Sequence, residues 1–365
     1  MNIVRPTLVL NKTTCLQNIE LMFEKAKRHH LRFRPHFKTH QSIEIGRWFR
    51  QLGVKCITVS SVGMAKYFAG DGWDDITIAI PFNVHETDDL NALLINSKIN
   101  ILVDCTETVT QLAEKIHHPV GVYIKISTGY NRSGISSISL SSIDLVLDAI
   151  KENPNMVFKG FLTHSGHSYN ALSRNEVQNI QFDAVQKMGQ LKRAYIKSYP
   201  YLELSIGDTP GCSISENFQG IDEIRPGNFV FYDLIQQNIG ACNIDDIAVR
   251  MHCPVISKQP SRNEIIIYGG AIHFSKDWLQ HIDGKPNYGR IVIKQNNEKI
   301  LLSQTSYLCR LSQEHGVLKV TSKEFRMINI GDIVEVIPVH SCLTAQAMGH
   351  YLTTKGEEIT TMNRF

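Results

Sequence analysis

Short apolar runs recur along the first two-thirds of the chain and alternate with segments of helical periodicity. In the segment 13–30, Leu16, Ile19 and Phe23 fall on one helical face, and a shorter segment ends at Gly53, a common helix stop. Eight runs have the length and composition of buried strands: LRFRPHFKTH from 31, KCITVSS from 55, DITIAIPF from 75, KINILVD from 98, VGVYIKIST from 120, VFKGFLTH from 157, YLELSIGDTP from 201 and IRPGNFVFYD from 224. This alternation predicts an α/β fold, a parallel (β/α)8 TIM barrel. A doubly wound open sheet is the structural alternative.

The pattern changes after about residue 242. Apolar alternation now comes in strands without helices between them: AVRMHCPVIS, NEIIIYGGAI, GRIVIKQNNEKILLSQ and GDIVEVIPVHSC. Asn296-Asn297 stands between two of these runs, where a tight hairpin turn fits. The sequence therefore predicts that an antiparallel β domain follows the barrel.

Composition and charge narrow the class of protein. The chain has 365 residues, of which 42% are hydrophobic and 20% charged, and a net charge of +3 without a long Lys/Arg run. These values are typical of a globular protein and do not favour nucleic-acid binding. No window resembles a signal peptide or a membrane span, and the eight cysteines contain no CxxC pair. We therefore expect a cytoplasmic protein with reduced thiols and no membrane partner.

Polar residues collect where the predicted barrel strands end. Lys38 ends the first run, Asp104 follows the fourth, His164 ends the sixth, and 207–209 follow the seventh. In a (β/α) barrel the active site lies at the carboxyl ends of the strands. These positions are therefore the candidate site.

The first run raises a question of charge, because every second residue is basic: Arg32, Arg34, His36, Lys38 and His40. If this face points into the barrel, crowding by positive charge and partial desolvation favour a neutral Lys38, as an imine-forming lysine requires. The alternative interpretation is a set of cations that pair with acids or reach solvent.

Two later patterns bear on this choice. SIGDTPGCS (205–213) and EIRPGNFVFYD (223–233) are turn-rich segments where barrels commonly bind phosphate, and pyridoxal phosphate carries both a phosphate and a lysine-reactive aldehyde. His340 and Cys342 are two apart on a predicted strand, so they share a face and could ligate one soft divalent ion. Such a pair is otherwise explained by core packing.

These segments resemble the D-serine dehydratase and D-threonine aldolase family, fold-type III pyridoxal-phosphate (PLP) enzymes with an alanine racemase-like barrel. RPHFKTH resembles the family's cofactor-lysine motif, and KISTGYNRSG and THSGHSY its segments after the fifth and sixth strands. GDTP and RPGN resemble its phosphate-binding turns, and HSC its metal pair.

The resemblance implies a set of site residues and a domain division. Lys38 would bind PLP covalently, and Tyr169, Thr209, Gly227 and Asn228 would contact it, while His340 and Cys342 would bind Zn²⁺ or another divalent metal. The family architecture implies a PLP-binding barrel at 13–242, a β domain made of 1–12 plus 243–365, and a homodimer. Further candidates for substrate contact or support are His36, Arg132, His164 and His273.

Three positions depart from the family pattern. Leu162 stands where family dehydratases often have tyrosine, and YGGAIHFSKD (268–277) replaces an Asp-Ala-Gly pattern, which makes His273 distinctive. Asp208 occupies the phosphate turn where a small neutral residue is common, and an anion there is unfavourable unless it points away.

The resemblance implies a PLP- and zinc-dependent lyase acting on D-3-hydroxy amino acids. His-x-Cys favours a D-serine or D-threonine dehydratase (an ammonia-lyase), whereas family aldolases tend to have His-x-Asp, and Leu162 leaves the D-threonine aldolase alternative open. An amino-acid racemase would need a second base, for which His273 or Tyr169 are candidates. A PLP-binding protein without catalysis and a metal-dependent hydrolase are the remaining alternatives.

Overall fold

The computed structural model describes residues 2–296 and 298–363. The chain forms two compact units, one from Met1–Ile19 with Asn228–Phe365 and one from Glu20–Gly227. These units are defined by spatial compactness. The boundaries at 12/13 and 242/243 were inferred from the family architecture and stay a prediction.

The unit Glu20–Gly227 is a closed parallel barrel, as predicted. Its eight strands follow one another around the barrel: β2 (Arg32–Phe33), β3 (Ile57–Val59), β4 (Asp75–Pro81), β5 (Lys98–Val103), β6 (Val120–Ser127), β8 (Met156–Thr163), β9 (Glu203–Ile206) and β10 (Glu223–Ile224). From β3 to β10 each strand pairs in parallel with the next. β10 pairs with β2, and a parallel bridge between His36 and Thr58 joins the first strand to the second. This closure excludes the open sheet. A short strand, β7 (Ile135–Ser136), adds to the end of β6.

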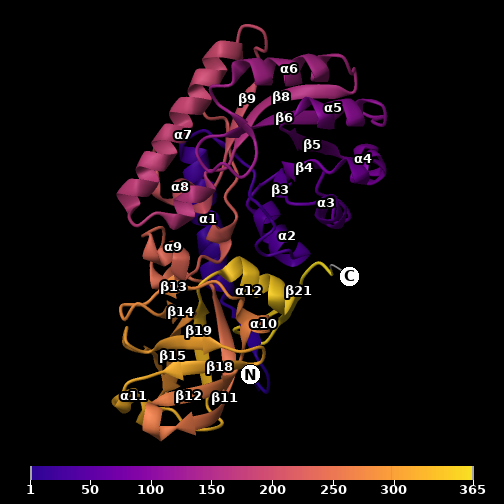
Figure 1. Cartoon of the computed structure of the whole chain (residues 1–365). Helices are drawn as coiled ribbons and strands as arrows, with labels where there is room; N and C mark the ends of the chain where they lie inside the picture. The colour runs from indigo at the N-terminus through magenta and orange to yellow at the C-terminus, as the bar shows by residue number, and fades with distance from the viewer. Residues whose placement is uncertain (1, 297, 364–365) are drawn as a thin grey trace. The chain divides into compact units, whose positions relative to one another are not determined.

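Helices connect the barrel strands. They are α1 (Lys12–Arg28), which contains the boundary between the units, α2 (Ile43–Gln51), α3 (Val62–Ala69), α4 (Thr87–Leu94), α5 (Thr106–Ala113), α6 (Leu140–Lys151), α7 (Arg174–Tyr195) and α8 (Thr209–Ile214), with 3-10 turns η1 (Val84–Glu86) and η2 (Gly166–Asn170). Figure 1 shows α3, α4, α5 and α6 outside strands β3–β8. In α2 the buried face includes Ile45, Trp48 and Phe49, and the chain turns at Gly53 with φ +92°. Apolar faces therefore set these helices against the barrel.

The first and last barrel strands are shorter than the apolar runs predict. β2 and β10 contain two residues each, and Pro35 and Pro226 follow them closely. Proline has no N–H for the ladder, so regular pairing stops there. The chain stays extended beyond β2, because His36 N donates to the Pro226 carbonyl and Phe37 N to that of Thr58.

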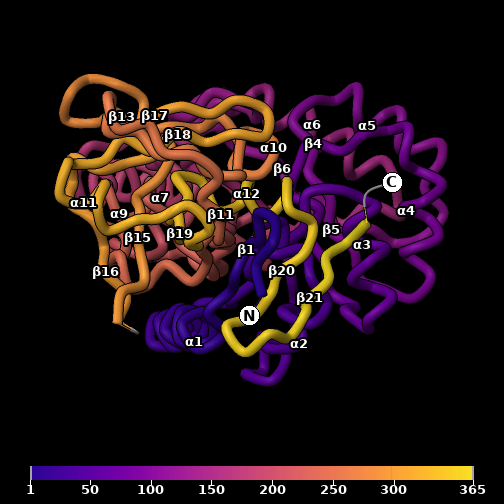
Figure 2. Tube along the Cα trace, turned by 90° about the horizontal axis from the view of Figure 1, so that it is seen from below, coloured from indigo at the N-terminus to yellow at the C-terminus, as the bar shows by residue number. Residues whose placement is uncertain are grey.

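The other unit is built on a closed antiparallel barrel. Six strands form it, in the order β12 (Glu264–Tyr268), β18 (His315–Lys319), β17 (Tyr307–Leu311), β15 (Gly289–Gln295), β19 (Ile333–Pro338) and β11 (Val249–Gln259), and β11 pairs again with β12. β1 (Thr7–Leu10) pairs with β11, so the start of the chain belongs to this sheet. Figure 2 shows β1 beside β20 (His350–Thr353), which continues to β21 (Glu358–Thr360).

The predicted hairpin joins β15 to β16 (Glu298–Leu301). Gln295 pairs directly with Glu298, and Asn296 has φ +49°, as a two-residue turn requires. Asn297 lies outside the described residues. β13 (Leu279–Gln280) and β14 (Pro286–Asn287) form a separate two-stranded pair.

The prediction that this unit has no helices between its strands is wrong. It contains α9 (Leu234–Asn238), α10 (Ala271–Phe274), α11 (Ser322–Met327) and α12 (Ser341–Met348), with 3-10 turns η3 (Asn228–Val230), η4 (Ile244–Asp246) and η5 (Pro260–Arg262). His340 is the N-cap of α12 and Cys342 lies in its first turn, so the predicted strand location of this pair is also wrong. The strand β19 ends at Pro338. The segment LTAQAM (343–348), with two alanines, a leucine and a methionine, favours a helix after it.

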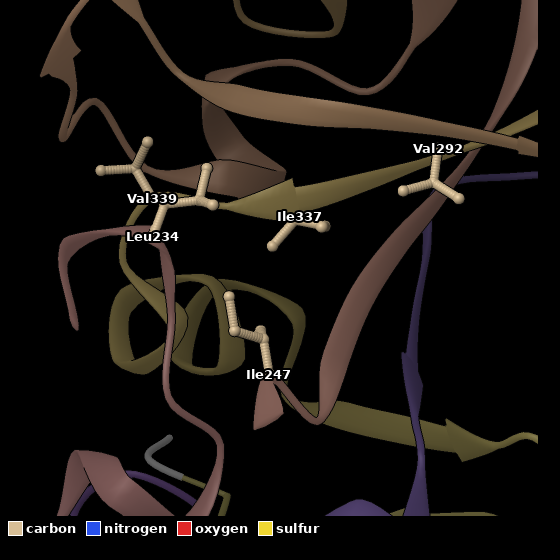
Figure 3. Packing of buried hydrophobic residues seen from close by; sticks show 5 residues of the cluster. All are labelled: Leu234, Ile247, Val292, Ile337 and Val339. Carbon is tan, nitrogen blue, oxygen red and sulfur yellow. The ribbon is translucent and has the colours of Figure 1, made fainter. Parts of the chain in front are cut away.

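An apolar cluster supports the junction of β19 with α12. Figure 3 shows its five side chains, which come from β15, β19, α9 and adjoining segments and are all at most 3% exposed: Leu234, Ile247, Val292, Ile337 and Val339. Ile235 N also donates to the Val339 carbonyl. Burial of each such side chain contributes roughly 1.5–3 kcal/mol, so the backbone that leads into His340 is firmly held.

Membrane insertion of a helix finds no support. Among the described residues, none of the helices combines the length and the apolar character needed to cross a bilayer.

Candidate active site

Lys38 lies at the carboxyl end of the first barrel strand. It follows the His36–Thr58 bridge, stands in a turn, and its side chain is exposed. The neighbouring Phe37 is fully buried and packs against Phe49 and Phe68 with ring centroids 5.1 and 5.0 Å apart. Since Phe37 anchors the turn, the backbone that carries the Lys38 amine is fixed while the amine itself is accessible.

Two histidines share the electrostatic environment of Lys38. Burial lowers the pKa of His36 well below its usual value, and the positive charges of Lys38 and Arg225 add to this effect. Burial also lowers the pKa of His164 to about 3. The Nδ1 of His164 lies within hydrogen-bonding distance of the Gly207 carbonyl, which can only accept, so Nδ1 carries the proton. His164 is therefore a neutral ring whose Nε2 is an acceptor.

Three further cations belong to this cluster. Burial lowers the pKa of Lys125 to about 8, with Arg225 and Arg132 adding to the shift and Asp104 opposing it. Arg225 is buried, and its Nε donates to Ser205 Oγ at 2.7 Å. Lys125 and Arg225 are buried, whereas Arg132 is exposed; buried positive charges favour an anionic ligand, such as a phosphate or carboxylate.

Lys125 was missed by the sequence analysis. Its only signal is a single lysine in the apolar run VYIKIS, at two residues from Tyr123 and hence on the same face of β6. Tyr123 belongs to a buried cluster with Leu102 and Leu162, and its hydroxyl bonds Glu203. Lys125 is therefore closer to the carboxyl end of β6 than Tyr123, and it pairs in register with Leu162.

The two basic residues that precede His36 have a structural role. Arg32 Nε and Arg34 Nε both donate to Glu223 Oε2 at 2.6 Å, and Arg34 also pairs with Asp75 at 2.6 Å. The ion-pair interpretation thus holds for Arg32 and Arg34. Lys38 alone among the alternating cations is left exposed.

The two glycine-containing turns lie close to these residues. An added Cβ at Gly207 would lie 2.8 Å from the Cβ of Arg225, and one at Gly227 would lie 2.9 Å from the His36 carbonyl oxygen. Only glycine permits such approaches. The turns predicted to hold a phosphate are therefore packed against the Lys38 segment at His36 and against the backbone and Cβ of the buried Arg225.

Tyr169 and Asp208 make the contacts that shape the first of these turns. The Thr209 N–H donates to the Tyr169 hydroxyl at 3.1 Å. Asp208 is the N-cap of α8, and its Oδ1 accepts from Ser168 Oγ at 2.7 Å and from Gly211 N at 2.6 Å. Burial raises the pKa of Asp208 to about 6, although Ser168, Gly211 and Arg225 oppose the shift.

This unit fits PLP by the chemistry of its groups. It offers an exposed amine at Lys38, buried cations for a phosphate, the Thr209 hydroxyl, and neutral imidazoles at His36 and His164. Lys38, His164, Tyr169, Thr209 and Gly227 all belong to this unit, whereas Asn228, His273, His340 and Cys342 belong to the other.

The predicted metal pair forms a second cluster. His340 Nδ1 lies 2.6 Å from Asp277 Oδ2, and the same ring also bonds Cys342. Burial alone would lower the pKa of His340, but these two partners outweigh it and raise the pKa to about 11. A carboxylate on Nδ1 is the common support for a metal-binding imidazole, whose Nε2 then serves as ligand.

Asn228 joins this cluster through its amide. Its Nδ2 donates to Asp233 Oδ2 at 2.7 Å and lies 3.3 Å from the Cys342 sulfur. Asp233 also accepts from Ser341 N at 3.0 Å, which fixes the start of α12. The Oδ1 of Asn228 is buried and has no hydrogen-bond partner within the described residues.

This cluster fits a soft divalent metal with an incomplete protein ligand set. His340 and Cys342 supply a nitrogen and a sulfur, and Asp277 stands behind the imidazole. Within residues 2–296 and 298–363, no group of three or more His, Cys, Asp or Glu side chains is arranged to hold a metal. Two protein ligands would leave positions for water or substrate. Asp277 was not identified from the sequence, because 63 residues separate it from His340.

The remaining predicted residues have other contacts. His273 accepts from Gly270 N at 3.1 Å through Nδ1 and packs edge-on against Tyr268. Arg132 is exposed and stacks over the Tyr130 ring at 5.0 Å. These contacts leave the roles suggested for His273 and Arg132 as predictions.

Known proteins resemble the chain over its whole length. The alanine racemase N-terminal domain model matches residues 11–234, and the putative serine dehydratase domain model matches residues 248–354. A D-serine dehydratase from Dictyostelium discoideum is 29% identical, covering 96% of this chain and 93% of the relative. A D-threo-3-hydroxyaspartate dehydratase from Delftia sp. is 25% identical, covering 95% of this chain and 93% of the relative.

Solved structures agree on the fold. The structure of the Delftia enzyme has a TM-score of 0.91 at 23% identity and covers 100% of this chain and 99% of its own. A cysteine-to-alanine mutant of that enzyme, described as a metal-free form, has a TM-score of 0.90 at 23% identity. The match covers 100% of this chain and 99% of the mutant's chain.

A parallel barrel with a lysine at its mouth, followed by an antiparallel β domain, defines the alanine racemase-like, fold-type III class of PLP enzymes. Within this class, the chain belongs to the family of the alanine racemase N-terminal domain, and its later part is similar to the putative serine dehydratase domain. It is accordingly a PLP-dependent lyase.

Proposed function

We propose that the protein is a PLP- and zinc-dependent dehydratase that releases ammonia from D-3-hydroxy amino acids such as D-serine or D-threonine. The observation that carries the proposal is the exposed amine of Lys38 on a rigid turn beside buried cations. The relatives named as dehydratases, which match nearly the whole chain, support the same reaction class. The His-x-Cys pair supports the choice of dehydratase within the family.

The residues of the barrel would bind the substrate and move its proton. PLP, once bound, withdraws electrons from the bond broken at the substrate Cα. The Lys38 amine would take the Cα proton, since it is accessible while its backbone is fixed. Arg225 and Lys125 would balance the charge of phosphate and carboxylate groups, and neutral His164 would accept a hydrogen bond at Nε2.

The residues of the other cluster would act on the β-hydroxyl. His340 and Cys342 would hold a zinc ion, which would supply Lewis acidity at the β-hydroxyl and so make it a better leaving group. Asp277 would keep the His340 ring in the tautomer and orientation that ligation requires. The metal-free description of the Delftia mutant supports a metal in that relative, and by similarity in this protein.

D-threonine aldolase activity is the second candidate, and Leu162 is the reason to keep it. Family dehydratases often have a tyrosine at this position, whereas Leu162 is 1% exposed and packs against Leu102 and Tyr123. The side chain offers no hydroxyl, so one group associated with dehydration is missing.

D-threonine distinguishes the two reactions in a single assay. Ammonia with 2-oxobutanoate identifies elimination of the β-hydroxyl and supports the dehydratase proposal. Glycine with acetaldehyde identifies cleavage of the Cα–Cβ bond and supports the aldolase instead. With D-serine the corresponding products are ammonia with pyruvate for elimination, and glycine with formaldehyde for cleavage. If zinc-loaded enzyme releases ammonia and a keto acid from neither D-threonine nor D-serine, the dehydratase proposal is wrong.

We also propose a cytoplasmic homodimer. The described residues include all eight cysteines and none of them forms a disulfide, a state that a reducing compartment maintains. The family resemblance supports the dimer. Exposed apolar side chains in the unit Met1–Ile19 with Asn228–Phe365, here called the β unit, give it a physical basis.

A further inference from the structure

Asp208 is the residue of the phosphate turn that departs from the family pattern, and the structure gives it a defined partner set. The carboxylate is 3% exposed and points into the protein, where its Oδ1 accepts from Ser168 Oγ and Gly211 N. Ser168 is fully buried. The side chain is therefore turned towards the interior, which removes the objection to an anion in this turn.

Two hydrogen bonds join consecutive residues of two segments. Ser168 bonds Asp208, and Tyr169 bonds Thr209 through its hydroxyl and the Thr209 N–H, at 2.7 and 3.1 Å. The segment η2 and the start of α8 are thus held in register over two residues, although 40 positions separate them in the sequence. A two-point attachment fixes orientation as well as distance.

Gly211 and Gln181 lie close to the Asp208 carboxylate. An added Cβ at Gly211 would lie 2.6 Å from Gln181 Oε1 and 2.9 Å from Asp208 Oδ1, so glycine is required there. Gln181 is 2% exposed, and its Nε2 has no hydrogen-bond partner in the described part of the chain. A half-turn of the Gln181 amide would keep its shape and turn this donor towards the same niche.

We propose that Asp208 is a positioning residue for the cofactor phosphate: its buried carboxylate fastens the turn 207–211 to the Tyr169 segment. This inference rests on the proposed function, because the family resemblance assigns the turn to the PLP phosphate. Asp208 acts through Thr209 and Tyr169 rather than by touching the cofactor. This role requires a hydrogen-bond acceptor at the position of Asp208 Oδ1, and an asparagine side chain of the same shape also has an acceptor there.

The test compares PLP with pyridoxal, which lacks the phosphate. The proteins are wild type, Asp208→Ala, Asp208→Asn and Ser168→Ala, each stripped of cofactor with hydroxylamine and titrated while visible absorbance is followed. Asp208→Ala should weaken PLP about tenfold, since it removes an N-cap acceptor and one attachment. Pyridoxal affinity should be unchanged. Asp208→Asn should stay within about threefold of wild type, and Ser168→Ala should fall between.

Thr321→Ala is the matched control. Thr321 caps α11 in the other unit, where its side chain accepts from Glu324 N at 3.2 Å. Its loss should lower the unfolding temperature about as much as the loss of the Asp208 cap, but leave PLP affinity unchanged. If Asp208→Ala does not fold, Asp208→Asn and Ser168→Ala carry the comparison.

Three results overturn the inference. They are an Asp208→Ala protein that binds PLP like wild type, one that loses PLP and pyridoxal equally, and an Asp208→Asn protein as weak as Asp208→Ala. If Asp208→Ala does not fold, a Ser168→Ala protein with wild-type PLP affinity also overturns it. A wild-type protein that binds no PLP would instead refute the proposed function, and this is seen before any variant is compared.

Discussion

At the scale of single residues, Lys38 is the position on which the proposed chemistry depends. Replacing it with alanine should remove the visible absorbance of bound PLP and lower turnover at least ~10³-fold, because the covalent attachment and the base are lost together. Lys66→Ala is the control, since Lys66 is an exposed lysine of the same unit that pairs with Asp89 at 2.9 Å. The experiment measures the visible absorbance spectrum and the D-threonine turnover of both variants. Retention of the absorbance band and of full activity by Lys38→Ala would refute the assignment.

Asp277 should control metal affinity without being a ligand. Because it bonds His340 Nδ1, Asp277→Asn should weaken zinc binding about 10–100-fold, measured by competition with a chromogenic chelator. Asp283→Asn provides a matched control, since Asp283 makes the same kind of contact to His281 at 2.7 Å in the same unit. Equal effects of the two substitutions would show that Asp277 has no special relation to the metal.

Chelation tests the ligand pair itself. Removal of metal from the wild-type protein should abolish turnover and added zinc should restore it, whereas His340→Ala should not be restored by the same zinc concentration. Activity that survives complete chelation would exclude the proposed role of His340 and Cys342.

At the scale of elements, the interior of the parallel barrel is held by a buried ion network. Glu223 on β10 accepts from Arg32 and Arg34 on the first strand and from Ser205 on β9. Glu223→Gln should lower the free energy of unfolding by about 3–5 kcal/mol, because Arg32 and Arg34 both lose their shared buried counter-charge and keep only Glu203 and Asp75, which are partly exposed. Urea unfolding followed by circular dichroism measures this. Glu216→Gln, at an exposed carboxylate that pairs with Lys25 at 3.0 Å, should cost less than about 1 kcal/mol. Similar losses for both would contradict the network.

The same network predicts how stability depends on pH. Burial opposes ionisation of Glu223, but Arg34 and Arg32 outweigh it and lower its pKa from 4.5 to about 2. A lowered folded-state pKa stabilises the protein above the unfolded value, and this stabilisation is lost as pH falls towards the folded value. Urea midpoints should therefore drop between about pH 5 and about pH 3 in the wild type, and less in Glu223→Gln. An equal drop in the two proteins would assign the effect to other groups.

The sequence predicted elements well where apolar periodicity was long, and poorly where short motifs carry the site. Seven barrel strands lie largely within predicted runs, but the run 224–233 shares only Ile224 with β10, and β2 and β10 keep two residues each because proline interrupts the ladder. His340 and Cys342 were placed on a strand, whereas they begin α12. Asx caps and strand-to-helix junctions depend on tertiary contacts such as Asp233 with Ser341, which no local pattern displays.

At the scale of the whole molecule, the functional groups that escaped prediction are those whose partners are distant in sequence. Lys125 and Asp277 have ordinary neighbours along the chain, and only folding brings Arg225 near the first and His340 near the second. The family resemblance supplied Lys38, Tyr169 and Thr209, because their motifs are contiguous. The supporting groups are brought together only by the folded chain.

The exposed apolar side chains of the β unit predict the oligomeric state. Four large residues of this unit are 41–73% exposed: Ile272 in α10, Leu343 in α12, Trp278 between α10 and β13, and Ile282 between β13 and β14. The Thr344 hydroxyl donates to the Phe274 carbonyl, so α10 and α12, which carry Ile272 and Leu343, are connected. Burial of such residues against a second copy would remove their contact with water.

Sedimentation should therefore give about twice the 41.3 kDa of one chain. Trp278→Glu combined with Ile282→Glu should shift it to the monomer, whereas Tyr201→Glu, at a 93% exposed residue of the other unit, should not. A fully active wild-type monomer would refute the proposed dimer, and a double variant that remains dimeric would place its interface elsewhere.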